Sequence, residues 1–219
     1  MASLLSMHTL ILDDQSAPLS LELMPGMQAL CRTSDDQQTL RLLQLCTGLL
    51  IPDQGQVLLD GIATSSLSRQ QLLKLRCQFG IITPSGGLIA NLKLWENIML
   101  PLSYCRGGVT EVVEQQAEEL LRSFGYNGNL LALPGHLSVF ERRIAAFVRA
   151  AITRPRMMLY AGCFETLTPG QRQLLLNQAQ LLHQTIPGLV SLYLTSSSSA
   201  LKELQPDITC NLKLNATGQ

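Results

Sequence analysis

The 219-residue sequence has few charged and few aromatic side chains. Charged residues make up 15% of the chain and aromatic residues 5%, whereas typical soluble proteins carry roughly 25% charged residues. The sixteen basic residues are matched by sixteen acidic ones, so no excess positive field attracts nucleic acid or anionic lipid. The composition argues against a nucleic-acid-binding protein. A surface with so little charge is expected to be partly covered by a partner.

The sequence also lacks long apolar runs and a basic N-terminal segment. No stretch reaches the roughly 18 apolar residues of a membrane-spanning helix. The first basic residue is Arg32, so the positive segment of a secretory signal is missing. We therefore expect a cytoplasmic protein without direct membrane insertion, which lies at the inner face of a membrane only through a partner.

The cysteines and histidines form no metal-binding pattern. No Cys-x-x-Cys pair occurs, and no histidine stands at zinc-ligand spacing from a cysteine. We expect no metal site, and we expect reduced, mostly buried thiols, with Cys163 an unreactive one. The residues concerned are Cys31, Cys46, Cys77, Cys105, Cys163 and Cys210, with His8, His136 and His183.

Strand-like and helix-like segments alternate along the chain. The segments with the strand pattern are residues 4–12, 19–23, 27–31, 54–61, 77–82, 156–163, 188–195 and 207–214. Helices are predicted from residue 40 to about 48, over 68–76, 110–124 and 138–153, from 169 onward, and briefly after 195. Residues 83–102 look irregular. This alternation predicts a largely parallel sheet with helices on its faces.

Three quoted stretches resemble the ATP-binding domain of ABC transporters. GLLIPDQGQVLLDG, at 48–61, is similar to the turn and strand after a Walker A loop and its helix. LSVFERRIAAFVRAAITRPRMMLYAGCFETLTPGQRQ, at 137–173, is similar to the signature motif, Walker B strand and D-loop, in register. PSGGLIANLKLWENIMLPL, at 84–102, is similar to the loop after the Q-loop glutamine, most of all in Mla-type lipid-trafficking transporters.

The resemblance covers nearly the whole chain and implies its fold. We expect an α/β P-loop NTPase-like core with a mostly parallel sheet, an N-terminal antiparallel β portion and an inserted α-helical subdomain. Residues 1–219 would form a single domain, in which 1–82 and 155–219 make the core with its β portion. Residues 83–154 would make the helical subdomain that carries the signature motif.

The residues at the implied Walker A position differ from that motif. A Walker A loop uses glycines and a lysine around the phosphates, and a Ser or Thr on magnesium. Here Gln37 stands at the lysine position and Gln38 at the magnesium position. The other departing positions are Cys31, Ser34, Asp35 and Asp36, and only Thr39 is retained. Ser34 and Gln37 fit a capping box, so the following helix is expected to satisfy its own anion site.

The positions of the other implied motifs also lack the residues typical of the family. Pro84 replaces the Q-loop glutamine, Val139 and Phe140 follow a retained Ser138 in place of the signature glycines, and Ala161 and Gly162 replace the Walker B acids. Thr168 and Ser196 stand at the D-loop aspartate and the switch histidine. The sequence thus predicts a pseudo-ATPase and not an enzyme. It would have no catalytic residue, cofactor or metal, with ATP and magnesium entering only in an altered mode.

The predicted role is structural or regulatory, in a transporter of lipid or another hydrophobic substrate. Its partners would be an integral-membrane permease and an active ATPase paralogue or a second copy. The predicted permease interface is Pro84, Ser85, Gly86, Gly87, Leu88, Ile89, Leu94 and Trp95. Trp95 is equally consistent with a core position.

Two other functions remain open on the sequence. The chain could bind ATP in an altered mode, as a nucleotide sensor or a weak ATPase that drives transport. The fold could also be reused for an unrelated enzymatic activity near Cys163 or the signature helix. On that helix Arg142, Arg143 and Arg149 are expected to be solvated or paired with neighbours such as Glu141.

Overall fold

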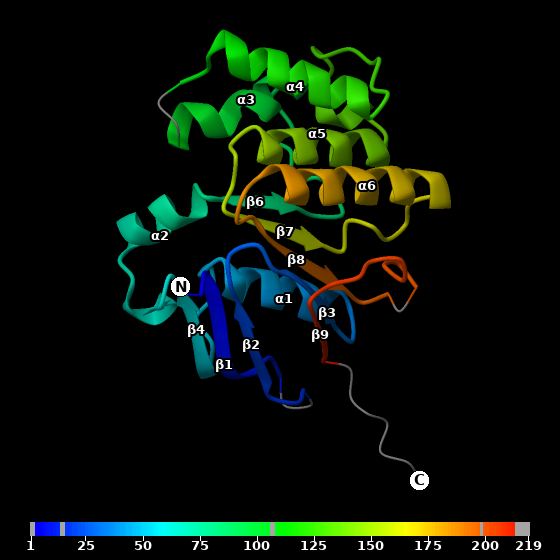
Figure 1. The fold of residues 1–219 in the computed structure, drawn as a ribbon. Coiled ribbons are helices and arrows are strands. Elements are labelled where there is room, and N and C mark those ends of the chain that lie inside the picture. The colour runs from blue at the N-terminus through cyan, green and yellow to red at the C-terminus, as the bar shows by residue number, and fades with distance from the viewer. Residues whose placement is uncertain (1–2, 14–15, 106–107, 198, 213–219) are drawn as a thin grey trace.

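A computed structural model describes residues 3–13, 16–105, 108–197 and 199–212, which form two sheets (Figure 1). The antiparallel sheet has the order β2-β1-β4-β5, from β1 (Leu5–Ile11), β2 (Leu19–Leu23), β4 (Gln54–Leu59) and β5 (Ile62–Ala63). The second sheet has the order β6-β7-β8-β3-β9, from β3 (Gln28–Arg32), β6 (Phe79–Ile82), β7 (Met157–Ala161), β8 (Val190–Thr195) and β9 (Ile208–Asn211). Every pairing in the second sheet is parallel.

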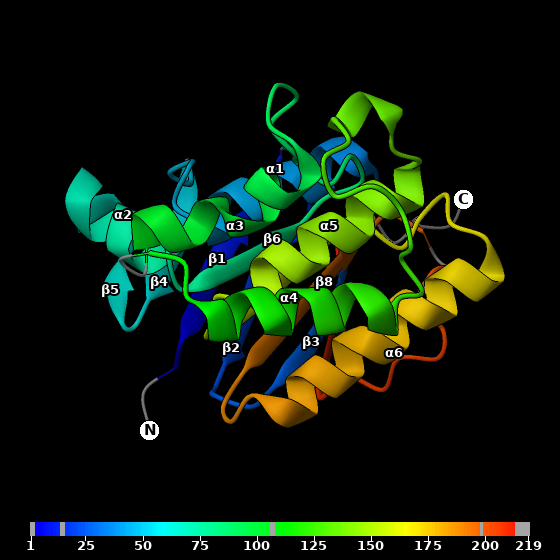
Figure 2. The same ribbon diagram turned by 90° about the horizontal axis from the view of Figure 1, so that it is seen from above.

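Helices cover both faces of the parallel sheet (Figures 1 and 2). α1 (Asp36–Cys46) lies between the two sheets. On the other face lie α5 (Val139–Ala151) and α6 (Pro169–Thr185), and α3 (Leu94–Cys105) and α4 (Glu111–Ser123) pack on α5. The short elements are α2 (Arg69–Arg76) and the 3-10 turns Thr64–Ser66 and Pro134–His136.

The parallel strands are buried on both faces, so their side chains alternate between two cores. From β7, Met158 and Tyr160 enter the core beneath α5 and α6, whereas Met157 and Leu159 enter the core around α1. The rings of Tyr160 and Tyr193 stack with their centroids 4.6 Å apart. This double burial explains why the strand sequences are continuously apolar.

The predicted alternation and the parallel sheet are confirmed, but two element predictions are wrong. α1 begins at Asp36, which the predicted capping box placed in the first turn, ahead of the apolar spacing from residue 40. The segment predicted to be irregular contains α3, which includes Pro101. The described residues between β8 and β9 form bends and turns in place of a short helix. α3 tolerates its proline because Ile98, Met99 and Leu102 are buried in the core, and tertiary packing outweighs local propensity.

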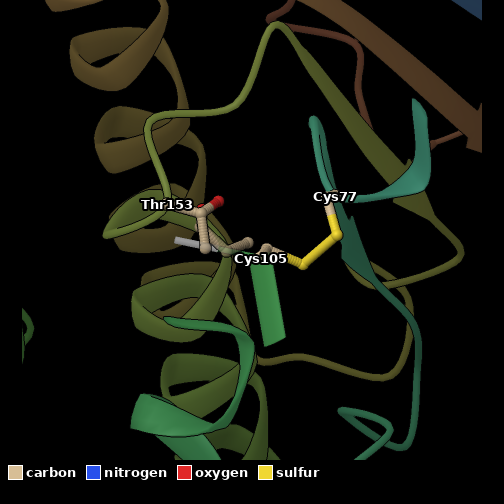
Figure 3. Close-up of a disulfide and its surroundings, with 4 residues drawn as sticks. Cys77, Cys105 and Thr153 are labelled. Carbon is tan, nitrogen blue, oxygen red and sulfur yellow. A yellow bond between two sulfur atoms is a disulfide. The ribbon is translucent and has the colours of Figure 1, made fainter. Parts of the chain in front are cut away.

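The prediction of reduced thiols is wrong for two cysteines. Cys77, which caps the end of α2, forms a disulfide with Cys105 at the end of α3, 28 residues further along the chain (Figure 3). The remaining free thiols are Cys31, Cys46 and Cys163, which are buried, and the half-buried Cys210. The pairing depends on the placement of α3, which the sequence pattern did not predict.

Candidate functional site at the start of α1

The candidate site lies where β3 ends and α1 begins, at the carboxyl edge of the parallel sheet. Residues 33–35 join the two elements, and the Thr33 N–H donates to the Thr195 carbonyl at the end of β8 (2.9 Å). In the sheet order β3 lies between β8 and β9, and β7 is the next strand beyond β8. In open α/β sheets ligands bind at this edge, and helix N-termini there favour anions.

The loop is closed by its own side chains. The N-cap of α1 is Asp35, whose Oδ1 accepts from the Gln38 N–H (2.7 Å). The buried Gln38 side chain accepts from the Ser34 N–H at Oε1 (2.8 Å) and donates from Nε2 to Asp13 Oδ2 (2.8 Å). The predicted capping box of Ser34 and Gln37 is therefore wrong by one residue. The cap is Asp35, the returning amide is Gln38, and Gln37 is exposed.

Two buried residues, Thr39 and Cys31, lie on the inner side of the loop between β3 and α1. Thr39 Oγ1 lies within hydrogen-bonding distance of Thr33 Oγ1 and donates to the Asp35 carbonyl (3.0 Å). Cys31 is fully buried and lies opposite Cys210 in the register of β3 and β9. The hydrogen bond that Cys31 donates to Cys210, together with burial, raises the pKa of Cys31. The Cys31 thiol therefore stays protonated and serves as core.

A second carboxylate cluster lies beside the first turn of α1. Ser196 Oγ donates to Asp36 Oδ1 (2.7 Å) and lies 3.3 Å from Glu165 Oε2. Glu165 Oε1 also accepts from Thr195 Oγ1 (2.6 Å) and the Ser196 N–H (3.1 Å). The sequence pattern singled out Asp36 and Ser196 but missed Glu165. No local signal identifies it, because its partners lie 30 or more residues away in the chain.

These residues do not fit a magnesium triphosphate in the usual Walker A mode. Arg32 is the only basic residue within 31–39, and the partial positive charge at the start of α1 already faces Asp35 and Asp36. A phosphate here would meet like charge, at about 1 kcal/mol per close pair in a water-like dielectric. The geometry therefore argues against triphosphate binding at the start of α1 in that mode.

The predicted Walker B and Q-loop positions meet each other at the end of β7. Ala161 is buried, and Gly162 adopts φ +59° while its N–H donates to the Leu194 carbonyl (2.9 Å). A Cβ on Gly162 would lie 3.1 Å from Cγ of the exposed Pro84. The carboxylate of this region comes instead from Glu165, three residues after Gly162.

The predicted signature and D-loop positions act as helix caps. Ser138 caps α5, with its N–H donating to Glu141 Oε2 (2.7 Å) and its Oγ accepting from the Glu141 N–H (3.2 Å). Thr168 caps α6 in the same way. Val139 is 42% exposed, whereas Phe140 packs against the core.

The predicted permease interface is only partly at the surface. Pro84, Ser85, Gly87 and Ile89 are exposed, and Ile89 retains 42% of its accessible area. Gly86 is buried and Leu88 packs against the core. The prediction is wrong for Leu94, which is fully buried. Trp95 is partly buried against the core, so it fits its core interpretation better.

The arginine prediction is wrong for two of the three residues on α5. Arg143 is 1% exposed, and both Arg143 and Arg149 donate to backbone carbonyls of other segments. Desolvation by burial lowers the pKa of both guanidinium groups. Neither Arg143 nor Arg149 takes part in any of the ion pairs found among the described residues.

The surroundings of Cys163 do not favour a reactive thiol. The Cys163 thiol is fully buried, and burial raises its pKa far above the ordinary value, so it is not a nucleophile. Among the residues that the structure describes, no group of three or more His, Cys, Asp or Glu could hold a metal ion. Within the same residues, every helix is too short or too polar to span a bilayer.

Sequence comparison relates the chain to transport ATPases. The family model described as ABC transporter matches residues 41–160. The chain is 26% identical over 145 residues to the intermembrane phospholipid transport system ATP-binding protein MlaF of Haemophilus influenzae, covering 66% of this chain and 55% of that protein. It is 27% identical over 153 residues to the methionine import ATP-binding protein MetN of Vibrio cholerae, covering 70% and 44%. The matches thus span about half the length of these relatives.

Structure comparison agrees on the fold. The dimeric post-hydrolysis structure of the ATP-binding cassette MJ0796 bound to ADP and Pi has a TM-score of 0.79 at 19% identity, covering 95% of this chain and 94% of that one. A structure of an ATP-binding subunit of an ABC transporter has a TM-score of 0.76 at 20% identity, covering 96% and 86%. The predicted P-loop fold is confirmed.

The comparisons overturn one functional prediction. The sequence pattern led us to expect that the chain is not an enzyme, yet the proteins it matches are ATP-binding proteins of transport systems. The substituted motif positions alone do not support an inactive subunit. The prediction failed because it treated each substituted position as a loss of activity, and a substitution at a motif position does not by itself show that loss.

Proposed function

The chain belongs to the ABC transporter family, and we propose that it serves as the ATPase-type subunit of a membrane transporter, bound to an integral-membrane permease. The chain would lie at the cytoplasmic face of the membrane through this partner, without inserting into the bilayer. Its second ATPase partner would be a copy of itself or an active paralogue. The observation that carries the proposal is the retained fold with a partly exposed loop, residues 84–89, which is hydrogen-bonded to α5.

The subunit would respond to ATP in an altered mode, as a nucleotide sensor or a weak ATPase. The support comes from the start of α1, where Asp35 already caps the helix and Gln38 closes the loop. No lysine is available within residues 31–39. The proposed contribution to transport is therefore nucleotide sensing or weak ATP hydrolysis in that altered mode.

The proposed substrate is a phospholipid or a similar hydrophobic molecule. The support is the phospholipid transport protein among the relatives, together with the Ser-Gly-x-Leu start of residues 85–88. The methionine import relatives make methionine the competing outcome. A reconstituted complex whose ATP turnover rises with phospholipid but not with methionine would support the lipid proposal, and the reverse response would overturn it.

The division into a core and a helical subdomain of residues 83–154 is also a proposal. It is supported by the packing of α3 and of α4 on α5. In this proposal the loop 84–89 lies where the core meets the helical subdomain. Movement of the helical subdomain relative to the core would therefore displace a docked permease.

Co-purification tests the permease partner. We expect the tagged chain, extracted from membranes of its own cells in mild detergent, to bring down an integral-membrane protein in fixed ratio. Ile89→Asp should abolish this association because it places a charge on the docking loop. Val112→Asp, at a 63% exposed position on α4, is the matched control and should retain the partner. Recovery of the wild-type chain alone would contradict the proposal.

Calorimetry with Mg-ATP tests the altered mode. We expect weak, saturable binding that Asp36→Asn strengthens about fivefold, because one like charge worth ~1 kcal/mol is removed. Glu119→Gln, on the exposed face of α4, removes the same charge elsewhere and should leave affinity unchanged. An absence of saturable heat in the wild type and in Asp36→Asn would refute nucleotide sensing by this site.

A further inference from the structure

Arg143 is the most completely buried charged side chain among the described residues, and its three hydrogen bonds reach two different loops. Nε donates to the Pro84 carbonyl (3.0 Å). Nη1 donates to the Glu165 carbonyl (2.6 Å) and Nη2 to Thr166 Oγ1 (3.0 Å). The Arg143 guanidinium therefore connects the loop after β6 to the loop after β7.

The loop after β6 is fastened along its length to α5. Arg149 Nη1 donates to the Gly87 carbonyl (2.8 Å) and Nη2 to the Gly86 carbonyl (3.0 Å). Gly86 has φ +79°, and a Cβ there would lie 2.6 Å from the Arg142 carbonyl. Residues 84–87 consequently cannot move without moving α5 or breaking these contacts.

Glu165 connects Arg143 to the start of α1. Its carbonyl accepts from Arg143, while its carboxylate accepts from Thr195 and Ser196. Ser196 in turn donates to Asp36 in the first turn of α1. The hydrogen bonds thus run without a gap from Pro84 through Arg143, Glu165 and Ser196 to Asp36.

A packing role alone does not account for this arginine. All three acceptors are uncharged oxygens, and none of the ion pairs in the described part of the chain includes Arg143. Desolvation by burial is the largest effect on its pKa, which it lowers, although the charge of Glu165 favours the cation. An apolar side chain of similar volume would fill the space at lower cost. Only a planar guanidinium presents donors to two loops at once in a fixed geometry.

We propose that Arg143 is a positioning residue that couples the loop 84–87 to the Asp36, Ser196 and Glu165 cluster at the start of α1. A partner that displaces this loop would shift Arg143, the Glu165 backbone and then the hydrogen bond between Ser196 and Asp36. The proposal rests on the proposed function, because a docked permease is the partner that would displace the loop. The route, meaning the series of hydrogen bonds from Pro84 through Arg143, Glu165 and Ser196 to Asp36, is a property of the isolated chain.

Hydrogen exchange of the purified chain tests the coupling. Ser196→Ala cuts the far end of the route, and we expect amides within residues 83–90 to exchange roughly threefold faster, a size usual for coupled sites. In an Arg143→Lys background the same Ser196→Ala change should leave that exchange unaltered, because a lysine cannot hold both loops. Arg142→Lys, one residue away, is the matched control and should preserve the threefold response.

A milder variant keeps the test decisive should Arg143→Lys unfold the protein. Thr166→Val removes only the Nη2 contact at an exposed position and keeps the β-branched shape. It should reduce the response to Ser196→Ala to less than half, with an unchanged melting temperature. The proposal is overturned if Ser196→Ala leaves the amide exchange of residues 83–90 unchanged in the otherwise wild-type chain. It is also overturned if Ser196→Ala accelerates that exchange as much in the Arg143→Lys and Thr166→Val backgrounds as in the otherwise wild-type chain.

These outcomes are separable from those of the proposed function. Loss of permease co-purification with intact coupling in the isolated chain would reject the docking partner and keep Arg143 as a positioning residue. Retained co-purification with no coupling would do the opposite.

Discussion

At the scale of single residues, the start of α1 is occupied by groups of the chain itself. Asp35 satisfies a backbone N–H, Asp36 accepts from Ser196, and Gln38 closes the loop. The sequence predicted carboxylates at a helix N-terminus, since Asp and Ser before an apolar periodic stretch indicate a cap. It predicted the wrong cap, Ser34, because Ser34 and Asp35 are both good caps and the choice depends on the path of the backbone after β3.

Replacement of the cap gives a direct residue-scale prediction. Asp35→Ala should lower the free energy of unfolding by about 1 kcal/mol, the usual cost of losing an N-cap. Ser34→Ala should change it by no more than a few tenths, because the Ser34 hydroxyl does not cap the helix. Urea denaturation of both variants measures the difference. Equal losses would restore Ser34 as the cap.

His183 on α6 predicts a pH dependence of stability. Desolvation by burial lowers its pKa, with Nδ1 2.9 Å from Ser191 Oγ and Nε2 3.1 Å from the Gly26 carbonyl. The unfolded chain, with a histidine pKa of about 6.5, binds the proton more readily, so stability is full above that value and falls as pH decreases below it. Urea denaturation between pH 8 and pH 5 should show this loss. His183→Gln should make the loss smaller, and an unchanged slope would exclude His183 as its source.

At the scale of elements, α3 departs most from the sequence pattern. Pro101 made the segment look irregular, yet Asn97 organises its start. Asn97 Oδ1 accepts from the Ile89 N–H (2.7 Å), and Nδ2 donates to the Ile89 and Leu92 carbonyls (3.0 and 2.9 Å). The helix forms because its apolar face is buried against α5, a long-range effect that local propensity cannot report.

The disulfide between α2 and α3 carries the element-scale prediction. Its 28-residue separation implies that Cys105→Ser lowers the free energy of unfolding by roughly 3–4 kcal/mol under oxidising conditions, since the unfolded chain loses a loop constraint. The double variant Cys77→Ser, Cys105→Ser should match the single one. Dithiothreitol should bring the wild type to the same value. A wild type insensitive to reductant would show that the two thiols are not paired.

At the scale of the whole molecule, two cores share one parallel sheet. Alternate residues of β7 and β8 enter the core beneath α5 and α6 or the core around α1. A substitution that destabilises either core should therefore destabilise the same strands. We expect the described parts of the chain to unfold together.

Core truncations test this cooperativity. Phe147→Ala, in the core beneath α5 and α6, should cost about 3–5 kcal/mol, and Leu42→Ala, in the core around α1, about 2–5 kcal/mol. Both residues are fully buried. Calorimetry should show one transition that either substitution moves to lower temperature. Two transitions, each moved by only one substitution, would mean that residues 83–154 unfold as a separate domain.

The sequence by itself determined the strand and helix alternation, the parallel sheet and the carboxylates at the start of α1, because hydrophobic period and capping chemistry are local. Only the tertiary structure decided that Glu165 and Ser196 meet Asp36, that Arg143 is buried between two loops, and that Cys77 pairs with Cys105. Ser196 and Asp36 are 160 residues apart in the chain, and Arg143 and Pro84 are 59 apart. Contacts over such separations depend on how the elements pack, and no local pattern encodes them.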